Sequence, residues 1–195
     1  MHSLKLIAGD DCIALKAGSP SINVTEVKCG PGHGISIGSL GEGADDQVEQ
    51  VHVTNCASNA TQNGAKNQDN NGKRIGIYGG SGFAREISFE QITLIASGNP
   101  IDIDQHYCNG NDHHCPDAGK AVAVNSVTVT YRGFYGTCAD DEVINLDCSN
   151  QGRIGITIDN VNVTSSLQGQ QLQAICNNAH ARATSTLPVI SCLLP

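Results

Sequence analysis

Two sets of short apolar strands alternate along the chain, and this alternation limits the fold more than any other feature of the sequence. The first set is Ile13-Ala14-Leu15, Ile35-Ser36-Ile37, Ile75-Gly76-Ile77, Ile101-Asp102-Ile103 and Ile144-Asn145-Leu146. The second set is Ile22-Asn23-Val24, Val51-His52-Val53, Ile87-Ser88-Phe89, Val127-Thr128-Val129 and Val161-Asn162-Val163. Each triplet has the period-2 pattern of a strand, and no unit can bury its own apolar face without a stacked neighbour. The pattern predicts an all-β fold of stacked repeats, a parallel β-solenoid.

The spacing of the strands indicates the size of one repeat. Members of the first set follow one another at steps of 22, 40, 26 and 43 residues, which fits a short coil that is twice interrupted by an insertion. Inserted loops on one face of such a fold are candidate binding loops. A β-sandwich also has short strands separated by turns, and it is the alternative architecture. The length of 195 residues suits one domain, which we expect to cover 1–195.

The composition agrees with this fold and argues against several kinds of partner. Gly accounts for 22 residues, Trp is absent and 4% of residues are aromatic, which fits many turns and few bulky core residues. No apolar run approaches the ~18 residues of a membrane span. A net charge of −8 without a basic cluster argues against nucleic acid. Because protonation of the seven His would remove most of that charge, an anionic ligand is compatible with acidic pH.

The cysteines and sequons indicate export from the cell. Nine cysteines without the paired spacing of a zinc site favour disulfides and an oxidising compartment. Sequons at Asn23, Asn59 and Asn162 agree with a secreted glycoprotein. The first residues lack the apolar core of a signal peptide. We therefore expect that the export signal is not part of this sequence and that the sequence starts within the fold.

Two segments contain residues suited to acid–base chemistry. Asp10-Asp11 precedes an apolar strand, where the plain alternative is an ordinary Gly-Asp-Asp turn. Two carboxylates that reach one cleft can have pKa values pushed apart, so that one donates a proton while the other stays ionised. His33 lies within Gly30-Pro31-Gly32-His33-Gly34, where the backbone can approach a ligand closely. Although a lone His is usually structural, His33 is the histidine that we select as a site candidate.

These segments resemble the plant polygalacturonases, the pectin hydrolases of glycoside hydrolase family 28. The resemblance rests on Gly9-Asp10-Asp11-Cys12 and on the string from Cys29 to Gly41. Gly79 to Arg85 and Asn99 to Cys108 are similar to further family segments in the same order, and the pollen-allergen polygalacturonases are close in pattern. The resemblance implies a right-handed parallel β-helix that hydrolyses α-1,4 links between galacturonate units of pectin with inversion. It implies no metal and no organic cofactor.

The resemblance also implies a role for each matching position. Asp10 matches the general acid that protonates the glycosidic oxygen, and Asp11 matches one of two carboxylates that activate the attacking water. His33 matches a histidine that supports the protonation state of the acid. Arg74 matches the Arg of an Arg-Ile-Lys substrate clamp, and Tyr107 matches a tyrosine at the sugar-binding cleft. A planar guanidinium suits a uronate because it can bind the carboxylate bidentately.

Two departures from the family pattern bear on activity. The family's Asn-Thr-Asp-Gly segment, which supplies the other water-activating Asp, has no counterpart before Asp10, so we expect the N-terminal coils to be missing. The clamp reads Arg74-Ile75-Gly76 and lacks its Lys, and Ala65 to Lys73 form an insertion or a gene-model artefact. The alternatives to an active hydrolase are a catalytically impaired or non-catalytic wall protein and a fragment of an active enzyme. Self-association through the uncapped end of the β-helix is also expected.

Eight of the nine cysteines are expected to form four disulfides. Cys12–Cys29 matches a family bridge, and the remaining pairs are expected between near neighbours, Cys108–Cys115, Cys138–Cys148 and Cys176–Cys192. Each closed loop of this size contributes about 2–3 kcal/mol when unstrained. Cys56 is left over and is expected to be a small buried apolar residue. The implied location is extracellular, in the plant cell wall, with pectin or polygalacturonate as the partner and neither nucleic acid nor a membrane.

Overall fold

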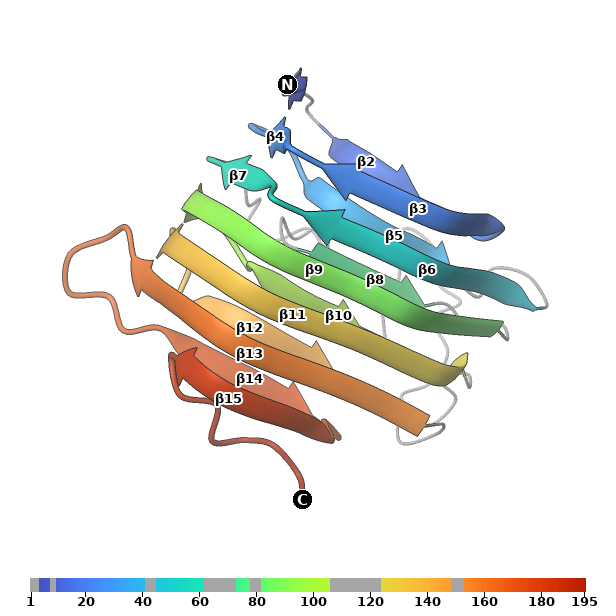
Figure 1. The fold of residues 1–195 in the computed structure, drawn as a ribbon. Coiled ribbons are helices and arrows are strands. Elements are labelled where there is room, and N and C mark those ends of the chain that lie inside the picture. Colours follow the sequence, from blue (N-terminus) through green and yellow to red (C-terminus); the bar gives the residue numbers. More distant parts are fainter. Residues whose placement is uncertain are drawn as a thin grey trace, which may run out of the picture.

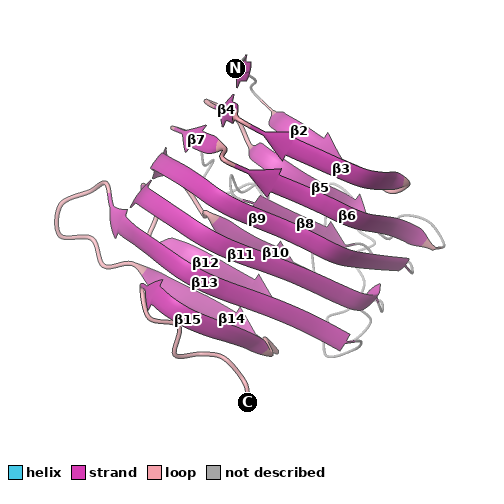
Figure 2. Cartoon of the chain, viewed as in Figure 1, coloured by secondary structure: helices cyan, strands magenta, loops and turns pink. Residues whose placement is uncertain are grey.

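The described part of the chain is built from β-strands, which form two parallel sheets (Figures 1 and 2). A computed structural model describes residues 4–7, 10–40, 45–61, 73–77, 82–105, 124–148 and 153–195. One sheet contains β2 (Asp11–Leu15), β5 (Gly34–Leu40), β8 (Lys73–Ile77), β10 (Ile101–Asp104), β12 (Glu142–Asp147) and β14 (Gln173–Asn177). The other contains β1 (Leu4–Leu6), β3 (Ser19–Thr25), β4 (Val27–Cys29), β6 (Asp46–Thr54), β7 (Ala57–Asn59), β9 (Gly82–Ser97), β11 (Val124–Cys138), β13 (Arg153–Ser165) and β15 (Ala181–Leu187).

The order of the strands confirms the all-β prediction and the alternation of two strand sets. All five members of the first set lie in the six-stranded sheet, whose order is β14-β12-β10-β8-β5-β2. All five members of the second set lie in the nine-stranded sheet. Figure 1 shows the six-stranded sheet behind the nine-stranded one, with the strands of each sheet following the order of the chain from the N-terminus to the C-terminus. Among the described residues, no helix is long and apolar enough to cross a membrane.

The core lies between the two sheets and consists of rows of apolar side chains in register. Val53, Phe89, Tyr131 and Ile158 are successive register partners across the nine-stranded sheet, and all four are fully buried. The rings of Phe89 and Tyr131 stack with their centroids 5.5 Å apart, and Phe134 meets Tyr131 edge-on at 5.9 Å. These rows fix the register, because a slip by one residue would turn every apolar side chain to the outer face.

The nine-stranded sheet bends at a position that is aligned in six successive repeats. The bend residues have φ between 53° and 68° and are Glu26, Asn55, Gln91, Gly133, Asn160 and Ser185. The residues just before them are register partners from strand to strand. Such left-handed backbone is uncommon for residues other than Gly and Asn. Its recurrence in six successive repeats therefore marks a structural element of the fold, one that lets β9, β11 and β13 continue past the bend.

This bend changes the alignment of one predicted strand. Val161 lies beyond the bend of β13, where its register partner is Phe134. The register partners of Val127 and Val129 in β13 are Ile154 and Ile156. The Val127-Thr128-Val129 and Val161-Asn162-Val163 triplets are therefore both strands, as predicted, but they occupy different positions within the repeat.

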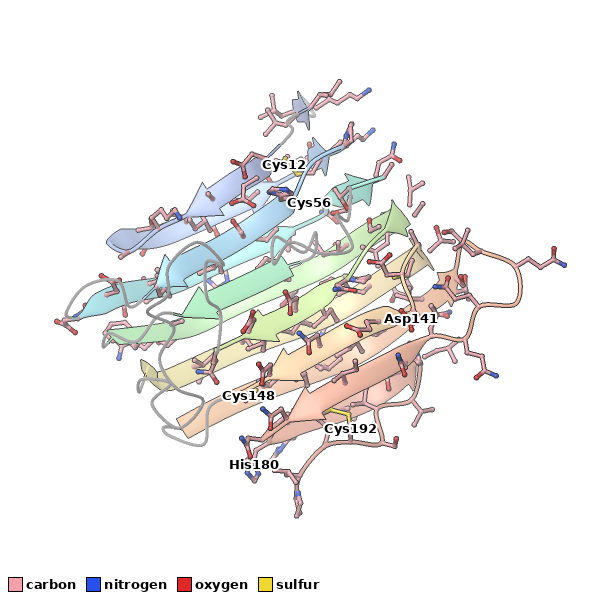
Figure 3. All side chains as sticks on the ribbon, turned by 180° about the vertical axis from the view of Figure 1, so that it is seen from behind. Cys12, Cys56, Asp141, Cys148, His180 and Cys192 are labelled. Carbon is pink, nitrogen blue, oxygen red and sulfur yellow. A yellow bond between two sulfur atoms is a disulfide. The ribbon has the colours of Figure 1, made fainter. Side chains whose placement is uncertain are left out.

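Disulfides lie near the two ends of the sheet stack and free thiols lie between them (Figure 3). Cys12–Cys29 and Cys176–Cys192 are formed as predicted, with Cα atoms 5.8 Å and 5.5 Å apart. The predicted Cys138–Cys148 bridge is wrong, because both cysteines are free and buried. Strand β12 runs between them, and its six residues at ~3.3 Å each keep the two positions far beyond the ~7 Å limit for a bridge. Cys108–Cys115 lies outside the described residues.

Candidate active site

Asp10 and His33 lie side by side because each precedes one of two paired strands. β2 begins at Asp11 and β5 at Gly34, and these two residues are register partners. The His33 backbone N–H donates a hydrogen bond to the Asp10 backbone carbonyl at 2.9 Å. In the side chains, Nδ1 of His33 lies 3.0 Å from Oδ1 of Asp10. The structure thus brings together residues that are 23 positions apart in sequence.

A close approach of two backbones fixes the turn that holds His33. Gly30 has a φ of 125°, and a Cβ at this position would lie 1.8 Å from the carbonyl oxygen of Asn59. Only glycine fits there. The preceding residue, Cys29, is tied to Cys12 in β2 by the disulfide. The bridge and the glycine therefore hold the His33 turn against the strand that Asp10 enters.

The local hydrogen bonds favour the ionised form of Asp10. The Asp11 backbone N–H donates to Oδ1 of Asp10 at 2.7 Å. This bond, followed by the contact with His33, lowers the pKa of the Asp10 carboxyl below its usual value. The Asp10 side chain is 88% exposed and that of His33 is 26% exposed. In the free protein the geometry therefore favours a carboxylate at Asp10, whereas a general acid must carry a proton.

Asp11 completes a compact cluster of three titratable side chains. One oxygen of Asp10, one oxygen of Asp11 and a ring nitrogen of His33 all lie within 4.8 Å of one another. This spacing is shorter than the ~6.5–9.5 Å that separates the two carboxyl groups of a typical inverting glycosidase. Two carboxylates and an imidazole are also ligand types that divalent transition metals accept. Exposed acidic groups are common without a metal, and the arrangement alone assigns none.

The backbone places Arg74 two strands from Asp11. Arg74 lies in β8, which pairs with β5 on one side and with β10 on the other. Its register partners are Ser36 in β5 and Asp102 in β10. The position of its side chain lies outside the described part of the structure, as does the whole of Tyr107.

Asp102 is a site candidate that the sequence analysis missed. Its side chain is buried, with 2% exposed, and its Oδ1 accepts a hydrogen bond from Nδ2 of Asn145 at 2.9 Å. It is also the register partner of Arg74. The signal was present in the sequence as an aspartate between two isoleucines of a strand, since the apolar neighbours assign the aspartate to the opposite face.

Two parallel sheets with this acidic cluster at the start of paired strands are compatible with a glycoside hydrolase, and sequence comparison identifies the family. The sequence profile of glycosyl hydrolases family 28 matches residues 2–186. This match covers most of the chain, so the chain belongs to glycosyl hydrolases family 28, the polygalacturonase family. The resemblance inferred from the Asp10 and His33 segments is confirmed.

Curated relatives carry the same family name. The chain is 39% identical over 193 residues to a probable polygalacturonase of Arabidopsis thaliana. The matched region covers 96% of this chain and 40% of the relative. It is 36% identical over 189 residues to an exopolygalacturonase of Zea mays, covering 94% of this chain and 43% of the relative. A polygalacturonase of Malus domestica is 41% identical over 172 residues, 87% of this chain and 34% of the relative. The chain thus spans less than half the length of these relatives.

Proposed function

We propose that this chain takes part in the hydrolysis of α-1,4-galacturonosyl links of polygalacturonate, with inversion, as a secreted protein of the plant cell wall. The observation that carries the proposal is the cluster of Asp10, Asp11 and His33 at adjacent strand entrances. Family membership and the two disulfides support it. The proposed fold is a single domain over 1–195, a right-handed parallel β-helix, which the alternating parallel sheets support.

In the proposed reaction Asp10 is the general acid and Asp11 helps to activate water. The Asp10 proton goes to the glycosidic oxygen as its bond to C1 breaks. Water attacks C1 from the opposite side, and its proton passes to a carboxylate, so that charge and atoms balance. Substrate between Asp10 and Asp11 would have to widen the compact spacing of the free cluster, and the exposed Asp10 side chain has the freedom to turn.

An anionic substrate would supply the protonation state that the free site lacks. The Asp10 pKa is lowered in the free protein by the Asp11 N–H and by His33. A uronate carboxylate placed nearby is a like charge and raises the pKa of Asp10. Substrate binding is therefore proposed to convert Asp10 from a carboxylate to a competent acid, most effectively at acidic pH.

Arg74 and Tyr107 are proposed to bind the substrate. Arg74 is suited to a uronate carboxylate because its guanidinium can form two parallel hydrogen bonds. Its neighbour in register, Asp102, is a buried acid that suits the anchoring of a guanidinium. Gly76 stands where the family clamp has Lys, so we expect weaker substrate binding than a complete clamp would give.

A second candidate function is pectin binding without catalysis. It is favoured by one observation, the ionised and 88% exposed Asp10 of the free site. Such a member, comparable to pollen-allergen polygalacturonases, would keep the uronate contacts and lack the proton donor. A third hypothesis is that this sequence is a fragment of a longer active enzyme, since it spans 40% of the Arabidopsis relative.

The hydrolase proposal is tested by the release of reducing ends from polygalacturonate near pH 5. The chain is compared with Asp11→Asn and with the control Glu86→Gln, which removes an exposed carboxylate. Glu86 has a φ of 55°, and Gln50 at the aligned position of β6 has a φ of 56°, so glutamine suits this backbone. Activity that is lost in Asp11→Asn and kept in Glu86→Gln supports catalysis by the cluster. No activity in the parent, with its β-structure intact by circular dichroism, rejects catalysis by this chain and favours pectin binding without catalysis.

We also propose self-association through the N-terminal strands. Among the described residues, β2 pairs only with β5 and β3 only with β6, so each has one open edge. Leu4 and Ile7 nearby are 54% and 69% exposed. Open strand edges beside apolar side chains favour pairing with another chain. A monodisperse monomer in light scattering across a wide range of concentration would contradict this proposal.

A further inference from the structure

Exposed apolar side chains flank one of the three sequon asparagines. Asn162 lies in β13, and its register partners are Tyr135 in β11 and Leu187 in β15. Tyr135 is 42% exposed and Leu187 is 50% exposed. Asn162 and the sequon residue Thr164 are exposed, whereas Val163 between them is buried. All three neighbours in this row therefore present their side chains to solvent on the outer face of the nine-stranded sheet.

The Tyr135 ring is held close to the sheet. Nδ2 of Asn160 donates a hydrogen bond to the Tyr135 hydroxyl. The ring lies against the backbone at Gly133, where an added Cβ would be 3.4 Å from Cε2 of Tyr135. An aromatic ring fixed in this way loses little further conformational entropy when a ligand packs on it. Tyr135 is thus an ordered apolar surface beside an exposed acceptor amide.

We propose that Asn162 carries an N-linked glycan whose innermost N-acetylglucosamine packs on Tyr135 and Leu187. A lipid-linked oligosaccharide diphosphate is the donor. Nδ2 of Asn162 loses one hydrogen and forms a bond to C1 of the sugar, the lipid diphosphate leaves, and the proton passes to a base of the transferase. The C–H face of the pyranose ring then covers apolar surface that water otherwise contacts. The glycan then stabilises the outer face of the nine-stranded sheet by covering these two side chains.

A groove beside Tyr135 offers space for the sugars that follow. Its volume is about 470 Å³, and it crosses four successive repeats from Lys28 through Ala57 and Thr93 to Tyr135. The amide side chains of Asn55 and Gln91 also line it. Glu26 lines the groove as well, and amides, a carboxylate and a tyrosine are suitable hydrogen-bonding and packing partners for the hydroxyl groups of a saccharide. The groove ends at Tyr135, the register partner of Asn162, so it is within reach of a glycan that extends over the ring.

The other two sequons provide internal comparisons. Asn59 has one exposed apolar partner, Ile95, which is 49% exposed. Asn23 has His52 as its partner, and Nδ1 of His52 lies 2.9 Å from the Ser88 hydroxyl. A glycan at Asn23 would cover polar side chains that already have partners. Its contribution to stability should therefore be small, and Asn23 is the matched control for Asn162.

The test is a double-mutant cycle on the full chain, secreted from insect cells behind a host signal peptide. Thr164→Val removes the Asn162 sequon while keeping the asparagine and a strand-forming residue. Tyr135→Thr removes the ring and introduces the residue that Thr93 already provides in the same row of β9. Peptide mass spectrometry measures occupancy at Asn162, and thermal unfolding measures the effect of the glycan in each background. Asn23→Gln is the control for loss of a glycan as such.

We expect occupancy at Asn162 and a fall in Tm of about 2–4 °C in Thr164→Val, the shift that corresponds to about 1 kcal/mol for a chain of this size. In the Tyr135→Thr background the same change should lower Tm by less than half as much. Tyr135→Phe should keep most of the effect, because it keeps the ring. An unmodified Asn162 in the secreted protein overturns the proposal, as does an equal fall in Tm with and without the ring. Neither result depends on hydrolytic activity, so this proposal and the proposed function can fail separately.

Discussion

The middle repeats and the outer repeats of the described structure are stabilised in different ways. In the middle, Phe89 and Tyr131 are fully buried and stack on one another, and the thiols of Cys138 and Cys148 stay free. In the first repeat, Ile13 and Ile22 are only half-buried. A middle strand has apolar neighbours on both sides, whereas an outer strand has them on one side. The disulfides Cys12–Cys29 and Cys176–Cys192 lie in the outer repeats, where the packing is weaker.

The residues that stabilise the core and the residues of the candidate site lie in different repeats. The cluster of Asp10, Asp11 and His33 lies in the first two repeats, beside the Cys12–Cys29 bridge. Exposed, ionisable side chains are incompatible with the dry core of the middle repeats but are tolerated where a strand entrance faces solvent. The Cys12–Cys29 bridge holds the two strands together where apolar packing is weak. In the described structure, the Cys12–Cys29 bridge and the backbone hydrogen bond from His33 to Asp10 hold the site beside the two strand entrances.

The largest effect is expected in the middle of the core. Phe89→Ala removes a fully buried ring that stacks on Tyr131 and should lower the free energy of unfolding by about 3–5 kcal/mol. Ile22→Ala in the outer repeat should cost less than half as much, because Ile22 is only half-buried. Urea unfolding of both variants measures the difference. Equal losses would mean that outer and middle repeats are packed alike.

The next effect is expected from the C-terminal disulfide. Replacing Cys176 and Cys192 by Ser opens a loop of 16 residues and should lower the free energy of unfolding by about 3 kcal/mol. Cys138→Ser in the middle breaks no bridge and serves as the single-thiol comparison. Thermal unfolding with and without reductant reports the contribution of the bridge. A Cys176/Cys192 variant as stable as the parent would show that the outer repeat needs no cross-link.

The buried thiols should be chemically inert while the protein is folded. Burial raises the pKa of Cys138 and of Cys148 to about 12 in each case. At pH 8 the reactive thiolate is then about one part in ten thousand. Iodoacetamide labelling followed by peptide mass spectrometry should modify both residues only after unfolding by guanidinium. Rapid labelling of the native protein would indicate that the middle repeats open readily.

The smallest effect is expected at the exposed cluster. His33→Ala removes one of the two main contacts that lower the Asp10 pKa, so this pKa should rise toward its usual value. Because the folded pKa of Asp10 lies below its unfolded value, its stabilising contribution is present above the unfolded value and is lost as pH falls through the folded one. For so exposed a pair this amounts to less than about 1 kcal/mol.

Carboxyl chemical shifts measured by NMR during a pH titration report the Asp10 pKa directly. His180→Ala is the control, since Nδ1 of His180 lies 2.9 Å from a backbone oxygen of Pro195, in the last repeat. An Asp10 pKa that does not move in His33→Ala would show that the Nδ1–Oδ1 contact is absent in solution.

The sequence predicted those parts of the fold that depend on alternating apolar side chains. Isoleucine triplets such as Ile35–Ile37 and Ile101–Ile103 identified strands of the six-stranded sheet, because their inward positions are fully buried. The last repeat was missed. Its half-buried positions include Ala174, Ala181 and Ala183, which give a weak apolar pattern.

Other features depend on distances that a sequence does not contain. Left-handed bends at Glu26 and Gln91 involve residue types that rarely signal positive φ. The wrong Cys138–Cys148 pair came from nearness in sequence, although an extended strand lies between the two residues. For the site, the motif identified Asp10, Asp11 and His33, whereas the lowered pKa of Asp10 depends on a backbone N–H that no motif specifies.

The proposed inverting hydrolysis of α-linked galacturonate by the Asp10–Asp11 cluster can be tested by the configuration of its product. The most direct measurement is ¹H NMR of a trigalacturonate digest in the first minutes, before the two anomers of the product equilibrate. We expect that the new reducing end appears first as the β anomer, and that the signal is lost in Asp11→Asn. A first product with the α configuration, or no product from a folded chain, would contradict it.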